Sequence, residues 1–153
     1  MKKVLFEQMT NILLVIFLAI ALIQAIPTAY LNSSGFYVEL GIFGTAFLIT
    51  FIVSISLRFV LASKWKKDGY TMAQGEFSTR DEREKMIRDK AATATYKVAI
   101  GVMTVSTAVL FFLMISSLNA IAVKQLVIAV LSTTVVLSMF VYLFSWIVFD
   151  RKL

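Results

Sequence analysis

The chain contains no cysteine and no histidine, and it has one proline and six glycines among 153 residues. It can therefore form no disulfide, thiolate nucleophile or Cys/His zinc site, and it lacks the imidazole group that serves most often in acid–base catalysis. So few turn-forming residues, combined with long and continuously apolar stretches, favour helices over a β-barrel, whose strands alternate with period two.

Charged residues are also scarce, at 16% of the sequence, whereas hydrophobic residues make up 59% and the mean hydropathy is +0.86. Soluble domains are about 25% charged and about 45–50% apolar. A soluble domain of this size could not bury so many apolar side chains, because small domains keep a large fraction of their surface exposed. The composition therefore predicts an integral membrane protein.

Four apolar segments are each long enough to cross about 30 Å of hydrocarbon as a helix. Their expected limits are residues 9–31, 36–62, 98–117 and 122–149, with a cytosolic loop and an amphipathic arm over residues 63–97. The predicted fold class is all-α: a four-helix transmembrane bundle built from two antiparallel hairpins. We expect residues 1–153 to form a single integral membrane domain.

The first segment also has features of a signal peptide. Lys2 and Lys3 resemble its basic region, and the small residues Ala19 and Ala21 resemble a cleavage site. Because the apolar run continues past that site to Ile26, we expect the segment to be retained as a span.

Basic residues are distributed asymmetrically about the four spans. All fifteen Lys and Arg residues except Lys124 lie at the two termini, between the second and third spans, or, for Arg58, near the inner end of the second span. The positive-inside rule then places both termini and the central loop in the cytosol. The net charge of +6 is explained by this orientation and by attraction to anionic lipids, so we expect no nucleic-acid partner.

Several basic and aromatic residues near the inner ends of the spans are candidates for anchoring to lipid head groups. They are Arg58, Lys64, Trp65, Lys66, Lys67, Arg151 and Lys152.

The densest run of charge covers residues 78–92 and has the pattern of a helix start. Ser78 with Asp81, and Thr79 with Glu82, have the spacing of a capping box, which predicts a helix that begins near Arg80. Acidic residues then precede basic ones by four positions, the favourable order for local ion pairs; these pairs are Asp81–Lys85 and Glu84–Arg88.

Apolar residues follow in this run at helical spacing: Ile87, Ala91, Ala94 and Val98 share one stripe. We expect one continuous helix that begins as a cytosolic arm and enters the membrane near residues 96–97.

The same segment resembles the cytosolic motif of a bacterial family of small multi-span membrane proteins known only as a domain of unknown function. The residues that carry the resemblance are Asp81-Glu82-Arg83, Ile87, Lys90-Ala91 and Tyr96. The resemblance implies the plasma membrane of a bacterium and no known enzyme activity, and it transfers no catalytic residues to this chain.

Catalytic chemistry has no candidate residues in this sequence. The ionisable residues fall near the ends of the spans, although membrane enzymes and ion-coupled transporters place such groups at mid-depth. The adjacent carboxylates Asp81 and Glu82 point apart on a helix, and no second acidic cluster would complete a metal site. We therefore expect no enzyme activity, no metal and no cofactor.

Hydroxyl side chains occur within the last two spans. Most such groups bind their own backbone or a neighbouring helix. A polar path for a solute is the alternative, and its candidate residues are Thr104, Ser106, Thr107, Ser132, Thr133 and Thr134.

The function that we infer is that of a small non-enzymatic accessory protein. It would bind or modulate a membrane partner such as a sensor or a transporter, associate with itself, or confer immunity to a peptide toxin. An oligomeric small-solute transporter or channel unit is the alternative. The candidate docking residues are Arg80, Asp81, Glu82, Arg83, Arg88 and Lys90.

Overall fold

The computed structural model describes residues 2–32, 35–66, 70–71, 81–115 and 119–152. Four long helices dominate, and a short hairpin of two strands follows the first of them. The elements are α1 (Lys2–Ala25), β1 (Tyr30–Asn32), β2 (Gly35–Tyr37), α2 (Gly41–Lys64), α3 (Glu82–Ile115) and α4 (Ala120–Lys152). All four helices are long and apolar enough to cross a membrane, which confirms the predicted all-α transmembrane fold.

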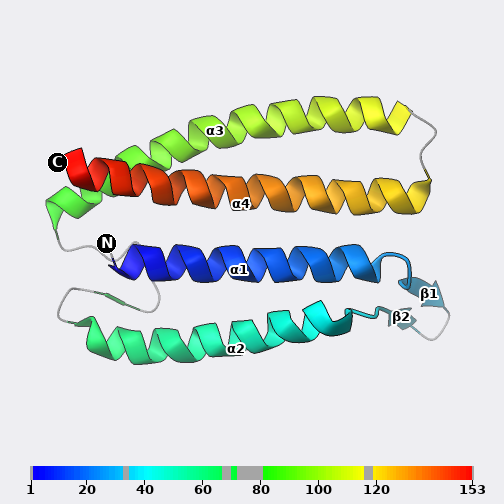
Figure 1. Cartoon of the computed structure of the whole chain (residues 1–153), viewed down its shortest axis with the longest axis horizontal. Helices are drawn as coiled ribbons and strands as arrows, with labels where there is room; N and C mark the ends of the chain where they lie inside the picture. The colour runs from blue at the N-terminus through cyan, green and yellow to red at the C-terminus, as the bar shows by residue number, and fades with distance from the viewer. Residues whose placement is uncertain (1, 33–34, 67–69, 72–80, 116–118, 153) are drawn as a thin grey trace.

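The helices lie side by side in the order α2, α1, α4, α3 (Figure 1). The two antiparallel hairpins that we predicted are α1–α2 and α3–α4, and they join through the packing of α1 against α4. The bundle is therefore an open row with α1 and α4 at its centre. Along the length of the helices, both termini lie at one end of the bundle, and the β1–β2 connection lies at the other (Figure 1).

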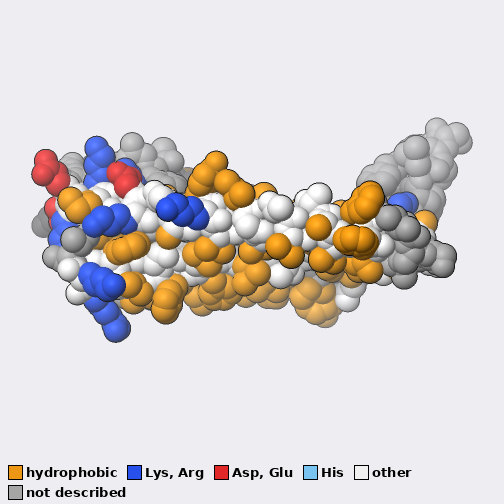
Figure 2. Space-filling view, turned by 90° about the horizontal axis from the view of Figure 1, so that it is seen from above, with side chains coloured by type: hydrophobic (Ala, Val, Ile, Leu, Met, Phe, Trp, Pro, Cys, Tyr) orange, Lys and Arg blue, Asp and Glu red, His pale blue; other side chains and the backbone are white. Residues whose placement is uncertain are grey.

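Lys and Arg side chains gather at the end that carries the termini, whereas hydrophobic side chains cover the length of the visible face (Figure 2). We call the first of these the charged end and the opposite one the hairpin end. Large apolar side chains that are strongly exposed include Ile42, Val105, Phe112 and Phe144. A helix that exposes such residues along its length is suited to a lipid environment.

The helix boundaries of the first hairpin differ from the predicted spans. Helix α1 ends at Ala25, because Pro27 follows and disfavours helical conformation in the residue before it. Pro27 offers no N–H to the carbonyl of Ile23, which instead accepts a hydrogen bond of 3.0 Å from the side-chain amide of Gln125 on α4 (Ala120–Lys152). Helix α2 begins at Gly41, whose φ of +59° lies in the left-handed region that glycine adopts without strain.

Helix α3 is continuous from Glu82 to Ile115, as the charge and apolar patterns predict. Its N-cap is Asp81, whose carboxylate accepts a hydrogen bond of 3.0 Å from the amide of Arg83. The capping residues that we predicted, Ser78 and Thr79, lie outside the described residues, as does Arg80.

The core sits at the charged end, where α1, α3 and α4 meet. Ile87 and Ala91, two members of the predicted apolar stripe, are fully buried and pack with Val4, Tyr142 and Trp146. The stripe turns outward beyond this point, since Val98 is 40% exposed. The arm of α3 therefore joins a core of three helices, whereas the apolar part of α3 packs, among the residues described, against α4 alone and exposes most of its surface.

Candidate functional site

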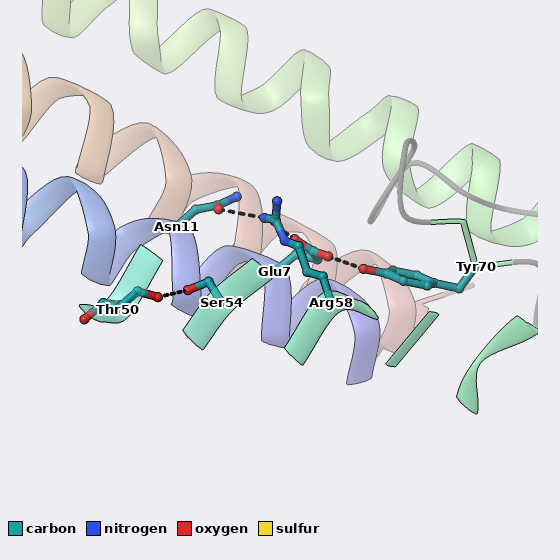
Figure 3. A network of polar contacts seen from close by, with 6 residues as sticks. All are labelled: Glu7, Asn11, Thr50, Ser54, Arg58 and Tyr70. Atoms are coloured by element: carbon teal, nitrogen blue, oxygen red, sulfur yellow. Dashed lines mark hydrogen bonds and ion pairs between the residues drawn. The ribbon is translucent and has the colours of Figure 1, made fainter. Parts of the chain in front are cut away.

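A network of polar side chains joins α1, α2 and the segment after α2 at the charged end (Figure 3). One carboxylate oxygen of Glu7 lies 2.5 Å from the guanidinium group of Arg58, and the hydroxyl of Tyr70 donates to the other oxygen. The same guanidinium group donates a hydrogen bond of 3.0 Å to the side-chain oxygen of Asn11. We call these four residues the Glu7 network.

Two features of the local sequence place these side chains together. Glu7 and Asn11 are four residues apart, so they lie on the same face of α1. Arg58 lies two turns before the end of α2, and the antiparallel hairpin brings that position level with the start of α1. Nearby Ser54 donates to the carbonyl of Thr50 in its own helix, at 2.5 Å (Figure 3).

Aromatic contacts hold Tyr70 in place. The ring of Tyr70 meets that of Trp65 edge to face, with 5.5 Å between centroids, and Trp65 meets Phe6 in the same way at 6.2 Å. The segment after α2 therefore folds back onto the first turns of α1.

Burial makes the pairing in this network energetically important. Glu7 is 3% exposed and Tyr70 is 2% exposed. A buried carboxylate is costly unless it is paired and hydrogen-bonded, and both conditions are met here. Burial raises the pKa of Tyr70, and its hydrogen bond to Glu7 raises that pKa further, so the hydroxyl group stays protonated and remains a donor.

Two further ion pairs connect the start of α3 to the other helices. The ammonium group of Lys3 lies 2.7 Å from the carboxylate of Glu84 and joins α1 to α3. The guanidinium group of Arg83 lies 3.5 Å from the carboxylate of Asp150 and donates a 2.7 Å hydrogen bond to its carbonyl, which joins α3 to α4. Glu84, which we had assigned to a local ion pair within the helix, and Arg83, which we had assigned to docking, thus make contacts between helices.

The remaining predicted docking residues have mixed environments. The guanidinium group of Arg88 lies 3.1 Å from the carboxylate of its neighbour Asp89. The ammonium group of Lys90 stands 6.0 Å from the centroid of the Phe149 ring, a cation–π distance. Glu82 is exposed in the first turn of α3. Within the predicted docking set, Asp81, Arg83 and Lys90 therefore have clear structural roles.

One face of the α3 arm forms an open groove of about 750 Å³ against the end of α4. We call it the charged groove. It is lined by Glu82, Lys85, Met86, Asp89, Lys90, Thr93, Ala94, Lys97 and Phe149.

One of the predicted lipid anchors has partners within the protein. Arg58 directs its guanidinium group to Glu7 and Asn11 on α1, where it forms a charge-assisted hydrogen bond to the buried carboxylate. Trp65 is half-buried between Phe6 and Tyr70.

The other basic residues that we predicted as lipid anchors have accessible side chains, and anchoring stays a prediction for them. Lys64, Lys66, Arg151 and Lys152 are exposed at the charged end, and Lys67 lies outside the described residues.

The hydroxyl groups of α3 and α4 do not converge on one path. Thr104 and Thr107 donate to carbonyls of their own helix and are exposed, and buried Thr134 does the same. Ser132 and Thr133 line a groove between α1 and α4, whereas Thr134 lines a different pocket that involves α3. This arrangement gives the transporter alternative no support.

Sequence reasoning missed the Glu7 network, although part of its signal was present. Glu7 and Asn11 are four residues apart, so they place two polar side chains on one face of the first helix, next to its apolar segment. Arg58, in the next span, carries the charge opposite to that of Glu7. Tyr70 carried no such signal, because its position depends on how the segment after α2 folds back.

Four apolar helices, with Lys and Arg side chains gathered at one end, define a multi-span integral membrane protein. The chain belongs to the family described as "Predicted membrane protein (DUF2178)", whose model matches residues 5–153. This match confirms the resemblance to a membrane-protein family of unknown function. No curated protein and no solved structure matches the chain.

Proposed function

We propose that this protein is a non-enzymatic accessory protein of the bacterial plasma membrane that binds and modulates a membrane partner such as a sensor or a transporter. The observation that carries the proposal is the charged groove on the arm of α3. The groove lies at the charged end, where Lys3 and Glu84 form an ion pair between α1 and α3. A ligand in the groove would therefore contact the arm of α3, which holds both hairpins together.

The chemistry of the groove favours an amphipathic helix from the partner's cytosolic part. Its walls carry both signs of charge, with Glu82 and Asp89 beside Lys85 and Lys97, and Phe149 adds an apolar contact. From the first to the last of these α3 residues the groove spans about 22 Å, the length of roughly four helical turns. An apolar helix face flanked by charges of both signs would fit such a groove.

The docking surface is accordingly shifted relative to the sequence prediction. Arg83 is engaged by Asp150, so reversing its charge would disturb the fold as well as any docking. Lys85 and Lys97 line the groove, and they are therefore the residues to test.

Reversing the charge of both residues (Lys85→Glu with Lys97→Glu) should reduce recovery of the partner at least about tenfold, which corresponds to about 1.4 kcal/mol of binding free energy. The measurement is mild-detergent purification at native expression level, with mass-spectrometric quantification of the co-purified membrane protein. A compensating reversal in the partner's amphipathic helix should restore recovery.

The matched control reverses two exposed lysines at the end of α2, Lys64→Glu with Lys66→Glu, and changes the net charge equally. Equal losses in both double variants would count against the groove. A clean homo-oligomer without a second protein would overturn the accessory function.

The orientation that we propose places both termini in the cytosol, and the gathering of Lys and Arg at the charged end supports it. Because the chain has no cysteine, single cysteines report topology cleanly. An impermeant maleimide applied to intact cells should label Ala120→Cys at the hairpin end. Lys66→Cys at the charged end should react only after permeabilisation, and labelling of this variant in intact cells would reverse the topology.

A further inference from the structure

The pocket that Thr134 lines lies between α1, α3 and α4, on the membrane side of the buried core. We call it the three-helix pocket. Its volume of about 500 Å³ is within the range of small-molecule sites, roughly 300–1,000 Å³. Its lining includes Gln8 from α1, Tyr96 and Met103 from α3, and Ser138 and Tyr142 from α4.

The pocket lies where the packing of α3 changes. Ile87 and Ala91 of its arm are fully buried against Tyr142 and Trp146, whereas the apolar part of α3 packs along α4 through side chains that are at most half-buried among the residues described. Small side chains on both walls, among them Ala92 and Ser138, leave space where larger ones would close the gap.

The two ends of the pocket differ in chemistry. Gln8 and Tyr142, each 6% exposed, lie beside the core at the end where a lipid's polar part would sit. Met103 and Val135 lie deeper, are 54% and 41% exposed, and form an apolar rim open to hydrocarbon. None of the described residues that line the pocket carries a charge.

We propose that the three-helix pocket binds a single-chain amphiphile with an uncharged, hydroxyl-bearing head group. Tyr96 also lines the pocket and is 67% exposed, so its phenol provides a hydrogen-bonding group for the hydroxyls, and flexible Met103 adapts to an alkyl chain. A charged head would lose its hydration without gaining a counter-ion in this pocket. This inference is independent of the partner-binding function.

The two tryptophans provide a direct test. Trp146 stands beside Tyr142, with 6.2 Å between ring centroids, whereas Trp65 packs against Phe6 and Tyr70 at the charged end. In the full-length Trp65→Phe variant, Trp146 is the only tryptophan. Titration of its nanodiscs with a monoacylglycerol brominated on its chain should quench Trp146 fluorescence saturably, and unbrominated monoacylglycerol should reverse the quenching.

Substitutions that fill the pocket should raise the concentration of brominated monoacylglycerol needed for half-maximal quenching at least about tenfold. Ser138→Phe fills it from α4 and Ala92→Leu from α3, so a folding failure in one variant leaves the other informative. Leu131→Phe adds similar bulk at a 58% exposed position of α4 outside the pocket, and it should leave the titration unchanged.

Brominated phosphatidylcholine serves as the control for contact with bulk lipid. It should quench Trp146 fluorescence weakly and without saturation. Equal quenching by both lipids would overturn the proposal, as would unchanged titrations in both filled variants. Saturable binding of brominated fatty acid in preference to monoacylglycerol would refute the uncharged head group.

Discussion

Replacement of Arg58 by leucine is expected to lower the free energy of unfolding by about 3 kcal/mol, the lower part of the range for breaking a buried ion pair. Glu7 is 3% exposed, and the substitution leaves its carboxylate with Tyr70 as its remaining partner in the network. We choose the lower part of the range because the side chain of Arg58 is 29% exposed, and water screens part of the interaction. Unfolding in mixed micelles, followed by circular dichroism, measures the change.

Two comparison variants identify the physical cause. The double variant Glu7→Leu with Arg58→Leu removes both charges, and it should be more stable than Arg58→Leu alone. Arg151→Leu removes a charge that is exposed at the end of α4, and it should change stability by less than about 0.5 kcal/mol. The interpretation fails if the double variant is the least stable of the three.

Truncation of Trp146 to alanine is expected to cost about 3–5 kcal/mol, the usual loss for a large aromatic residue in a core. Trp146 is 1% exposed and packs with Val4, Ile87, Ala91 and Tyr142, so the substitution leaves a cavity where three helices meet. Because α3 has its buried contacts in this region, we also expect the arm of α3 to become accessible to protease before global unfolding.

The matched control is Phe144→Ala on the same helix. Phe144 is 70% exposed, and in a membrane its side chain faces lipid. Its truncation should change stability by about 0.5 kcal/mol or less, with no change in proteolysis of the arm. Equal losses for Trp146→Ala and Phe144→Ala would mean that the core does not hold α3.

The start of α3, where we saw the resemblance to a membrane-protein family, illustrates how sequence and structure divide the explanation. Asp81 caps α3, Ile87 and Ala91 fill the core, and Arg83 binds the end of α4. Their helical spacing was evident in the sequence and predicted a continuous amphipathic arm. The sequence did not reveal that the apolar stripe would meet Trp146 or that Arg83 would meet Asp150, because those partners are distant along the chain.

By itself, the sequence determined the membrane class, the number of spans, the two hairpins and the asymmetry of charge, because these depend on composition and local periodicity. The tertiary structure alone decided that the helices form an open row and that three of them share a core at the charged end. It also decided that Arg58 faces Glu7. These features depend on which helix faces meet, and contacts between distant residues settle that choice.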